Sequence, residues 1–99
     1  MYEHAAVVNV SRYQPARGKR EDLLKAMKRM AERASSAEGC FGAQACQSDQ
    51  DREALVAVSR WKSEAALDAF SKTAESVSEQ EHMDRLLDGP ARRENLTPF

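Results

Sequence analysis

Residues 54–70, ALVAVSRWKSEAALDAF (Ala54–Phe70), decide the fold. The first eight residues predict a strand, because apolar side chains occupy most positions of both alternating rows. Ser63 then stands where a helix N-cap is expected, and Glu64 follows at the positive end of that helix. Trp61, the only tryptophan in the chain, lies at this corner between strand and helix. We predict that it secures the corner and also borders a binding cavity.

The segments before this corner predict a strand, a helix and a second strand. A valine-rich run indicates the first strand, helical spacing of apolar residues indicates the helix, and small residues around Phe41 indicate the weaker second strand. A loop with Pro15 and Gly18 precedes the helix, and Gly39 is expected to stop it. The predicted ranges are 4–13 for the first strand, 19–37 for the helix and 40–48 for the second strand.

The segments after the corner predict a second helix and a last strand. The polar, serine-rich residues 72–81 favour a break or kink in that helix, which resumes at 81–87 and ends at Gly89-Pro90, before a last strand in 91–99. This order of elements predicts an α+β fold of the ferredoxin-like βαββαβ kind, with a four-stranded antiparallel sheet and two helices on one face. The whole chain, 1–99, is expected to form a single domain.

Two helices cover only one face of such a sheet, yet both faces carry apolar side chains. In the third strand Val56 and Val58 belong to one row, and Leu55 and Trp61 belong to the other. The alternation alone does not fix which row meets the helices. Leaving several large apolar side chains in water costs about 1.5–3 kcal/mol each. A symmetric homodimer is therefore the expected cover, with two sheets face to face and a cavity on the concave side of each.

The composition argues against two classes of partner. The 99 residues carry a formal net charge of −1, with 41% hydrophobic and 31% charged residues, so neither nucleic acid nor a membrane is expected to bind. No apolar run approaches the roughly 20 residues of a spanning helix, and the N-terminus does not read as a signal peptide. Cys40 and Cys46 would lie about 20 Å apart on one strand, so we expect no disulfide and no metal site. A cytoplasmic location is the resulting expectation.

Three segments resemble the antibiotic biosynthesis monooxygenase (ABM) superfamily. They are YQPARGKREDLLKAM at 13–27, AEGCFGAQAC at 37–46 and VSRWKSEAALDAF at 58–70. The family pattern is a turn before the first helix, a glycine at the start of the second strand, and a strand that ends in Trp-x-Ser-x-x-Ala-Leu. Trp61, Ser63, Ala66 and Leu67 stand at those last positions. The resemblance spans about residues 5–90 and implies a dimeric α+β barrel.

No phosphate loop, nucleophile elbow or paired metal-ligand motif is present, so the candidate site rests on single residues. Asn9 interrupts an apolar strand, so its amide either binds a substrate carbonyl or an oxygen species, or is satisfied by nearby protein groups. The resemblance matches Asn9 to an asparagine of the heme-degrading branch. His82 lies in the helix segment that carries a histidine in that branch, and it is either a heme ligand or a surface residue.

Asn9 and His82 are the candidate catalytic residues, and the candidate substrate-binding residues are aromatic. Trp61 is the first of these, as a corner residue that also forms part of a pocket wall. Phe70 stands where the heme-degrading branch has a tryptophan, which opposes the heme interpretation. The four candidate substrate-binding residues are Trp61, Tyr13, Phe41 and Phe70.

Three functions from different classes remain open on the sequence. The resemblance favours a cofactor-independent monooxygenase that acts on a small aromatic or quinol-type substrate, in a cavity between the sheet and the helices of a homodimer. The second function is a heme-binding or heme-degrading monooxygenase. The third is a non-catalytic dimer that binds a small ligand, because Ser11, Tyr13, Ser59 and Arg60, the polar groups expected near the cavity mouth, form no evident acid–base pair. The sequence leaves open whether the chain is an enzyme.

Overall fold

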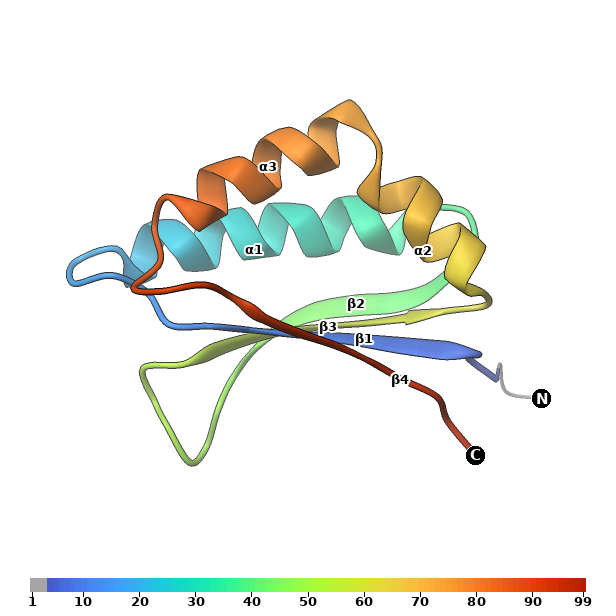
Figure 1. Ribbon diagram of the computed structural model, residues 1–99, viewed down its shortest axis with the longest axis horizontal. Coiled ribbons are helices and arrows are strands. Elements are labelled where there is room, and N and C mark those ends of the chain that lie inside the picture. Colours follow the sequence, from blue (N-terminus) through green and yellow to red (C-terminus); the bar gives the residue numbers. More distant parts are fainter. Residues whose placement is uncertain (1–3) are drawn as a thin grey trace.

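The computed structural model of the protein describes residues 4–99. Its elements are β1 (Val7–Tyr13), α1 (Arg20–Ser35), β2 (Cys40–Gln47), β3 (Leu55–Trp61), α2 (Glu64–Ser71), α3 (Ala74–Asp84) and β4 (Arg92–Leu96). The strands form one antiparallel sheet in the order β2-β3-β1-β4, and all three helices lie on one side of it (Figure 1). The predicted ferredoxin-like α+β fold is confirmed. Residues 1–3, which the predicted domain 1–99 includes, lie outside the described residues.

α1 lies against the sheet because its apolar residues recur at helical spacing. Leu23, Ala26 and Met27 are buried, and they pack in one cluster with Tyr13 of β1 and Leu55 of β3. The helix ends at Ser35, two residues before the predicted end. The chain then turns through residue 39, a glycine at φ 82°, a backbone angle that residues with a side chain rarely adopt. α1 therefore forms the middle layer over the sheet.

The second predicted helix is two helices, joined by a shorter break than expected. The Ser63 hydroxyl accepts a hydrogen bond from the Ala66 N–H at 3.1 Å, so this residue caps α2 as predicted. The Thr73 hydroxyl accepts from the Ser76 N–H at 3.2 Å and caps α3. The predicted break within residues 72–81 is confirmed at residues 72 and 73, but the prediction that the helix resumes only at residue 81 was wrong, because α3 begins at Ala74. Tertiary contacts overrode the weak local propensity, because Ser76 and Met83 are buried within α3.

One row of β1 and β3 faces the helices. Val7, Ser11 and Tyr13 are buried on β1, and they share this face with buried Leu55 and Trp61 of β3. In the register, Val7 lies opposite Trp61, and Tyr13 lies opposite Leu55. Asn9 belongs to the same row by alternation. The structure thus settles which row meets the helices, a choice that the sequence left open.

The opposite face of the sheet has an apolar centre, and none of the helices in the described part of the chain lies over it (Figure 1). Val10 is paired with Val58 on one side and with Glu94 on the other. Val8 and Val56 extend the apolar centre, and all four valines are half-buried. This surface, residues 8, 10, 56 and 58, is called the open face below. Homodimerisation through the open face stays a prediction.

Candidate functional site

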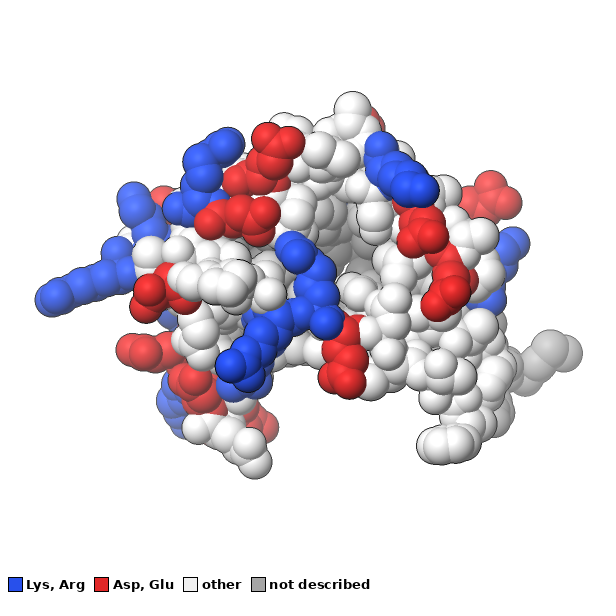
Figure 2. All heavy atoms as spheres, viewed as in Figure 1, with Lys and Arg blue, Asp and Glu red and all other residues white. Residues whose placement is uncertain are grey.

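A cavity of about 440 Å³ lies between the helices and the covered face of the sheet. All three helices and all four strands contribute lining residues. It opens as a hollow on the side of the molecule shown in Figure 2, with charged side chains around it. The position between sheet and helices agrees with the predicted site. This cavity lies within one chain on the helix side, and a second space enclosed by the sheets of two protomers stays a prediction.

The helices supply a mostly apolar wall, with Met27, Met30, Met83 and Phe70 among its members. The Phe70 ring centre lies 5.4 Å from that of Trp61, and the two ring planes are tilted by 37°. This geometry is typical of a favourable aromatic pair. These five residues, four from the helices and Trp61 from β3, are called the apolar wall below.

Trp61 belongs both to the core and to the cavity lining. Its side chain is fully buried, and its Nε1–H donates a hydrogen bond to the Ser59 hydroxyl at 2.8 Å. A buried indole N–H group needs such a partner. Here Ser59 provides it, two positions earlier on the same face of β3. The position agrees with the predicted double role at the corner and at the cavity. The hydrogen bond within β3 and the contact with Phe70 of α2 join strand to helix at this point.

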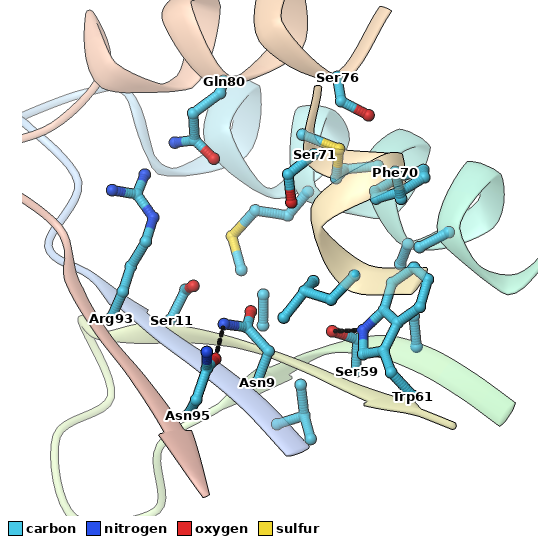
Figure 3. Close-up of a pocket in the computed structure, with 18 of the residues that line it drawn as sticks. Asn9, Ser11, Ser59, Trp61, Phe70, Ser71, Ser76, Gln80, Arg93 and Asn95 are labelled. Carbon is cyan, nitrogen blue, oxygen red and sulfur yellow. Dashed lines mark hydrogen bonds between the residues drawn. The ribbon is translucent and has the colours of Figure 1, made fainter. Parts of the chain in front are cut away.

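β1 and β4 supply the polar side of the cavity. In the sheet register Asn9 lies opposite Asn95, and Ser11 lies opposite Arg93. The Asn9 Nδ2 donates to Asn95 Oδ1 at 2.8 Å, and Ser11 is 4% exposed. All four line the cavity, and Figure 3 shows them along one edge of it. These two cross-strand pairs are called the polar ladder below.

α3 contributes polar groups on the opposite side. Ser76 is buried, and its hydroxyl is hydrogen-bonded to that of Thr73 at 2.8 Å. Gln80 donates through Nε2 to Asp84 Oδ1 at 3.0 Å. Ser76 and Gln80 line the cavity, together with Ser71 of α2. The cavity therefore has hydrogen-bonding groups at its rim on both sides and apolar surface between them.

An ion pair outside the cavity holds α3 in position above α1. The Arg29 guanidinium donates from Nε and from a terminal nitrogen to the two carboxylate oxygens of Glu79, each at 3.1 Å. Arg33 contacts the same carboxylate at 3.4 Å. These hydrogen bonds hold the pKa of the Glu79 carboxyl below its usual value, against the opposing effect of burial. The ion pairs thus join α1 and α3 on the helical side of the cavity.

The structure brings together four of the six predicted site residues. Asn9, Tyr13, Trp61 and Phe70 all line the cavity. His82 is half-buried on α3 and is not among the lining residues. Successive helix residues point about 100° apart, and here the next residue along α3, Met83, faces the cavity. Asn9 and His82 therefore do not meet in one site.

Phe41 and Arg60 also lie outside the cavity lining. Phe41 falls where the pairing of β2 with β3 shifts between Cys40 and Gly42, and such a bulge interrupts the regular alternation of side chains. Arg60 lies in the row of the open face, and its guanidinium donates to the Phe41 carbonyl at 3.3 Å. The expectation that Arg60 lies near the cavity mouth was wrong for this reason.

The cavity does not offer the ligand set that a histidine-ligated heme needs. None of the described residues that line it is a histidine or a cysteine. Within residues 4–99, no three or more His, Cys, Asp or Glu side chains are grouped so that they could hold a metal ion. The heme alternative thus finds no support in the placement of His82.

Within the described residues 4–99, no helix is long and apolar enough to cross a bilayer.

The sequence reasoning missed the contribution of β4. Arg93 and Asn95 line the cavity, yet residues 91–99 were predicted only as a last strand without a role in the site. The signal was the alternation in residues 92–96, where Arg93 and Asn95 share one face. That face becomes known only from the register with β1, which the sequence does not give.

Comparison with known proteins places this geometry in context. The sequence model of the family described as "Antibiotic biosynthesis monooxygenase" matches residues 6–82. No curated protein matches the chain significantly. Rv0793 from Mycobacterium tuberculosis superposes with a TM-score of 0.87 at 22% sequence identity, covering 94% of both chains.

Two further solved structures share the fold. A conserved protein from Methanosarcina mazei superposes with a TM-score of 0.88 at 20% identity, covering 94% of this chain and 92% of its own. A protein of Nitrosomonas europaea, proposed to be an antibiotic biosynthesis monooxygenase, gives 0.86 at 16% identity, covering 99% and 95%. At these identities the neighbours establish a common fold and nothing finer.

Proposed function

Because the chain belongs to the antibiotic biosynthesis monooxygenase family, we propose that it is a monooxygenase that oxidises a small aromatic or quinol-type substrate in the cavity between its sheet and helices. The observation that carries this proposal is the apolar wall in a cavity of about 440 Å³, formed by the helices and Trp61 of β3. The polar ladder of β1 and β4 borders this wall on one side, and Ser71, Ser76 and Gln80 border it on the other. A flat apolar molecule with oxygen substituents along one edge matches such a lining.

The proposed reaction uses dioxygen and needs no metal or prosthetic group. A phenol with a free ring C–H is converted to a quinone, so the ring loses the phenolic hydrogen and that ring hydrogen. One oxygen atom of dioxygen becomes the new carbonyl oxygen, and the other leaves as water with the two hydrogens. Dioxygen is the oxidant, and the substrate supplies all the electrons. The protein has to bind the substrate, favour its oxyanion and keep bulk water away.

The Asn9–Asn95 pair is the proposed donor for the substrate oxygen. One Nδ2 hydrogen of Asn9 is used in the bond to Asn95 at 2.8 Å. Its second Nδ2 hydrogen and the amide hydrogens of Asn95 are not used in this bond, and both residues form part of the cavity lining. Because the two amides hold each other, they are oriented before substrate arrives, and a donor fixed in advance stabilises a developing oxyanion.

Oxygen labelling tests this function. Purified protein is incubated with dihydroxynaphthalenes under labelled dioxygen, and label is measured in the quinone and in water. Asn9→Ala is expected to lower kcat about a hundredfold, which is typical for loss of one oxyanion donor. Ser78→Ala, an exposed change on α3, serves as the matched control and should retain full activity. Product that forms equally without oxygen, or full activity of Asn9→Ala, contradicts the proposal; binding without turnover indicates the non-catalytic alternative.

We further propose that the active form is a homodimer joined through the open face. Its four half-buried valines form an apolar centre that no helix within residues 4–99 covers. Val10→Lys puts a charge at this centre beside Glu94, its cross-strand neighbour, so the monomer itself should tolerate the change. Sedimentation velocity is expected to give a dimer for the parent protein and a monomer for Val10→Lys. Ala69→Lys, exposed on α2, should stay dimeric, and a parent protein that is monomeric at every concentration contradicts the proposal.

A further inference from the structure

We propose that Arg93 forms a subsite for an anionic oxygen group of the substrate, so that the preferred compounds are aromatic molecules with a carboxylate or an acidic phenol on one edge. This inference deepens the proposed function and rests on it. It assigns the specificity for charge to β4, at the end of the polar ladder. The remaining ladder residues, Asn9, Ser11 and Asn95, are uncharged donors and acceptors.

The position of Arg93 makes it the cation of the cavity. It lies opposite Ser11 in the sheet register, two residues along each strand from the Asn9–Asn95 pair and on the same face. Figure 3 shows its side chain rising from β4 toward Gln80 of α3, at the side of the cavity. Among the described residues that line the cavity, it is the only lysine or arginine. A group bound between the apolar wall and the ladder therefore meets one positive charge, on one side only.

The charge of Arg93 is only weakly neutralised within the chain. A terminal guanidinium nitrogen lies 3.8 Å from Asp84 Oδ1, and both side chains are about half exposed, at 46% and 53%. That distance is too long for a hydrogen bond, and exposed pairs of this kind contribute little. The same Asp84 oxygen already accepts a hydrogen bond from Gln80 at 3.0 Å. The guanidinium donors therefore stay available for a ligand.

The chemistry of the guanidinium selects the group that it binds. Its planar arrangement of N–H donors matches the two oxygens of a carboxylate, and such charge-assisted hydrogen bonds exceed those to a neutral carbonyl. Beside it, the Ser11 hydroxyl is nearly buried and lines the cavity, so it can donate to the same oxygen. Two other charged residues line the cavity. Asp68 lies on α2, and Glu94, next in sequence to Arg93, belongs to the opposite face of β4.

A matched pair of probes tests the inference. 1-Hydroxy-2-naphthoate and its methyl ester have the same rings and hydroxyl and differ in the charge of one group. Calorimetric titration of the parent protein is expected to give about tenfold tighter binding for the acid, the lower range for a charge-assisted hydrogen bond. Arg93→Gln should abolish this preference and leave the ester affinity unchanged, and Arg93→Lys should retain part of it.

Arg92→Gln is the control, because it removes the same charge one residue away on the opposite face of β4. It should keep the tenfold preference, and circular dichroism should confirm that each variant is folded. The inference is overturned if Arg93→Gln keeps the preference or if Arg92→Gln loses it equally. If the parent protein binds acid and ester equally, this inference fails while the proposed cavity function stands. If neither probe binds, both fail.

Discussion

Replacing Trp61 by alanine separates the two roles that the structure gives this residue. Trp61 is fully buried, donates a hydrogen bond to Ser59 at 2.8 Å, and contacts the Phe70 ring with a centre separation of 5.4 Å. It also lines the cavity. If its first role is to hold the corner between β3 and α2, the substitution destabilises the fold whether or not a ligand is present.

The expected cost follows from what the side chain contacts. Removing a fully buried tryptophan costs about 3–5 kcal/mol, including the void that remains. A domain of this size has a free energy of unfolding of about 5–15 kcal/mol, so Trp61→Ala would remove a large fraction of it. Trp61→Phe keeps most of the ring contact and removes the N–H, for which about 1–2 kcal/mol is expected. Ser59→Ala should cost about 1–3 kcal/mol, because it leaves a buried indole N–H without an acceptor.

Urea unfolding at one fixed protein concentration measures these values, with far-ultraviolet circular dichroism as the signal. The double variant Trp61→Phe/Ser59→Ala should cost less than the sum of the single changes, because both remove the same hydrogen bond. The reasoning is refuted if Trp61→Ala changes the free energy of unfolding by less than about 1 kcal/mol, which lies well below the range for a buried aromatic residue. Loss of ligand binding together with unchanged stability would assign Trp61 to ligand contact alone.

Two further predictions concern the frame around the cavity. Gly39→Ala should destabilise the protein by at least about 1 kcal/mol more than Gly18→Ala. Residues 39 and 18 have similar positive φ angles of 82° and 77°, but only at residue 39 would the new Cβ lie 2.7 Å from the Ala66 Cβ. Equal urea midpoints for the two variants would contradict the steric argument. The lowered Glu79 pKa means that its pair with Arg29 adds stability above the unfolded-state pKa, near 4.5, and that this stability is lost as the pH falls through the folded-state pKa. Glu79→Gln should therefore flatten the acid side of the stability profile, measured by thermal unfolding between pH 7 and pH 3, and an unchanged acid slope would show that the pair carries no pH dependence.

The parts of the fold that local sequence determines were predicted well. The cap at Ser63 and the corner at Trp61 depend on residues that lie within a few positions of each other, so the pattern around them was sufficient. The helical stretch after Thr73 was mispredicted, because its stability comes from contacts with α1 that are remote in sequence. Glu79 is held by α1, and Met83 is buried in the main cluster. Serine-rich composition indicates a weak helix only when such contacts are ignored.

The candidate site was predicted less completely than the fold, for a geometric reason. Asn9 was identified because a polar residue within an apolar strand is conspicuous at any register. Arg93 was missed, because a charged residue in a polar strand gives no such signal, and its face depends on the pairing of β4 with β1. His82 was selected by its place in the resemblance. Successive residues of α3 point about 100° apart, and Met83, the next residue, lines the cavity instead.

The two sides of the cavity should tolerate change very differently. β4 is one of the two edge strands of the sheet, and all five of its residues are exposed, although Arg93 and Asn95 supply half of the polar ladder. Exposed substitutions usually change stability by less than about 0.5 kcal/mol. Asn95→Ala should therefore alter ligand affinity at little cost in folding, whereas Trp61→Ala should cost several kcal/mol, about 3–5 by the reasoning above. Ligand preference in this fold can thus change through its edge strand while the buried corner stays fixed, and a destabilisation by Asn95→Ala comparable to that of Trp61→Ala would contradict this separation.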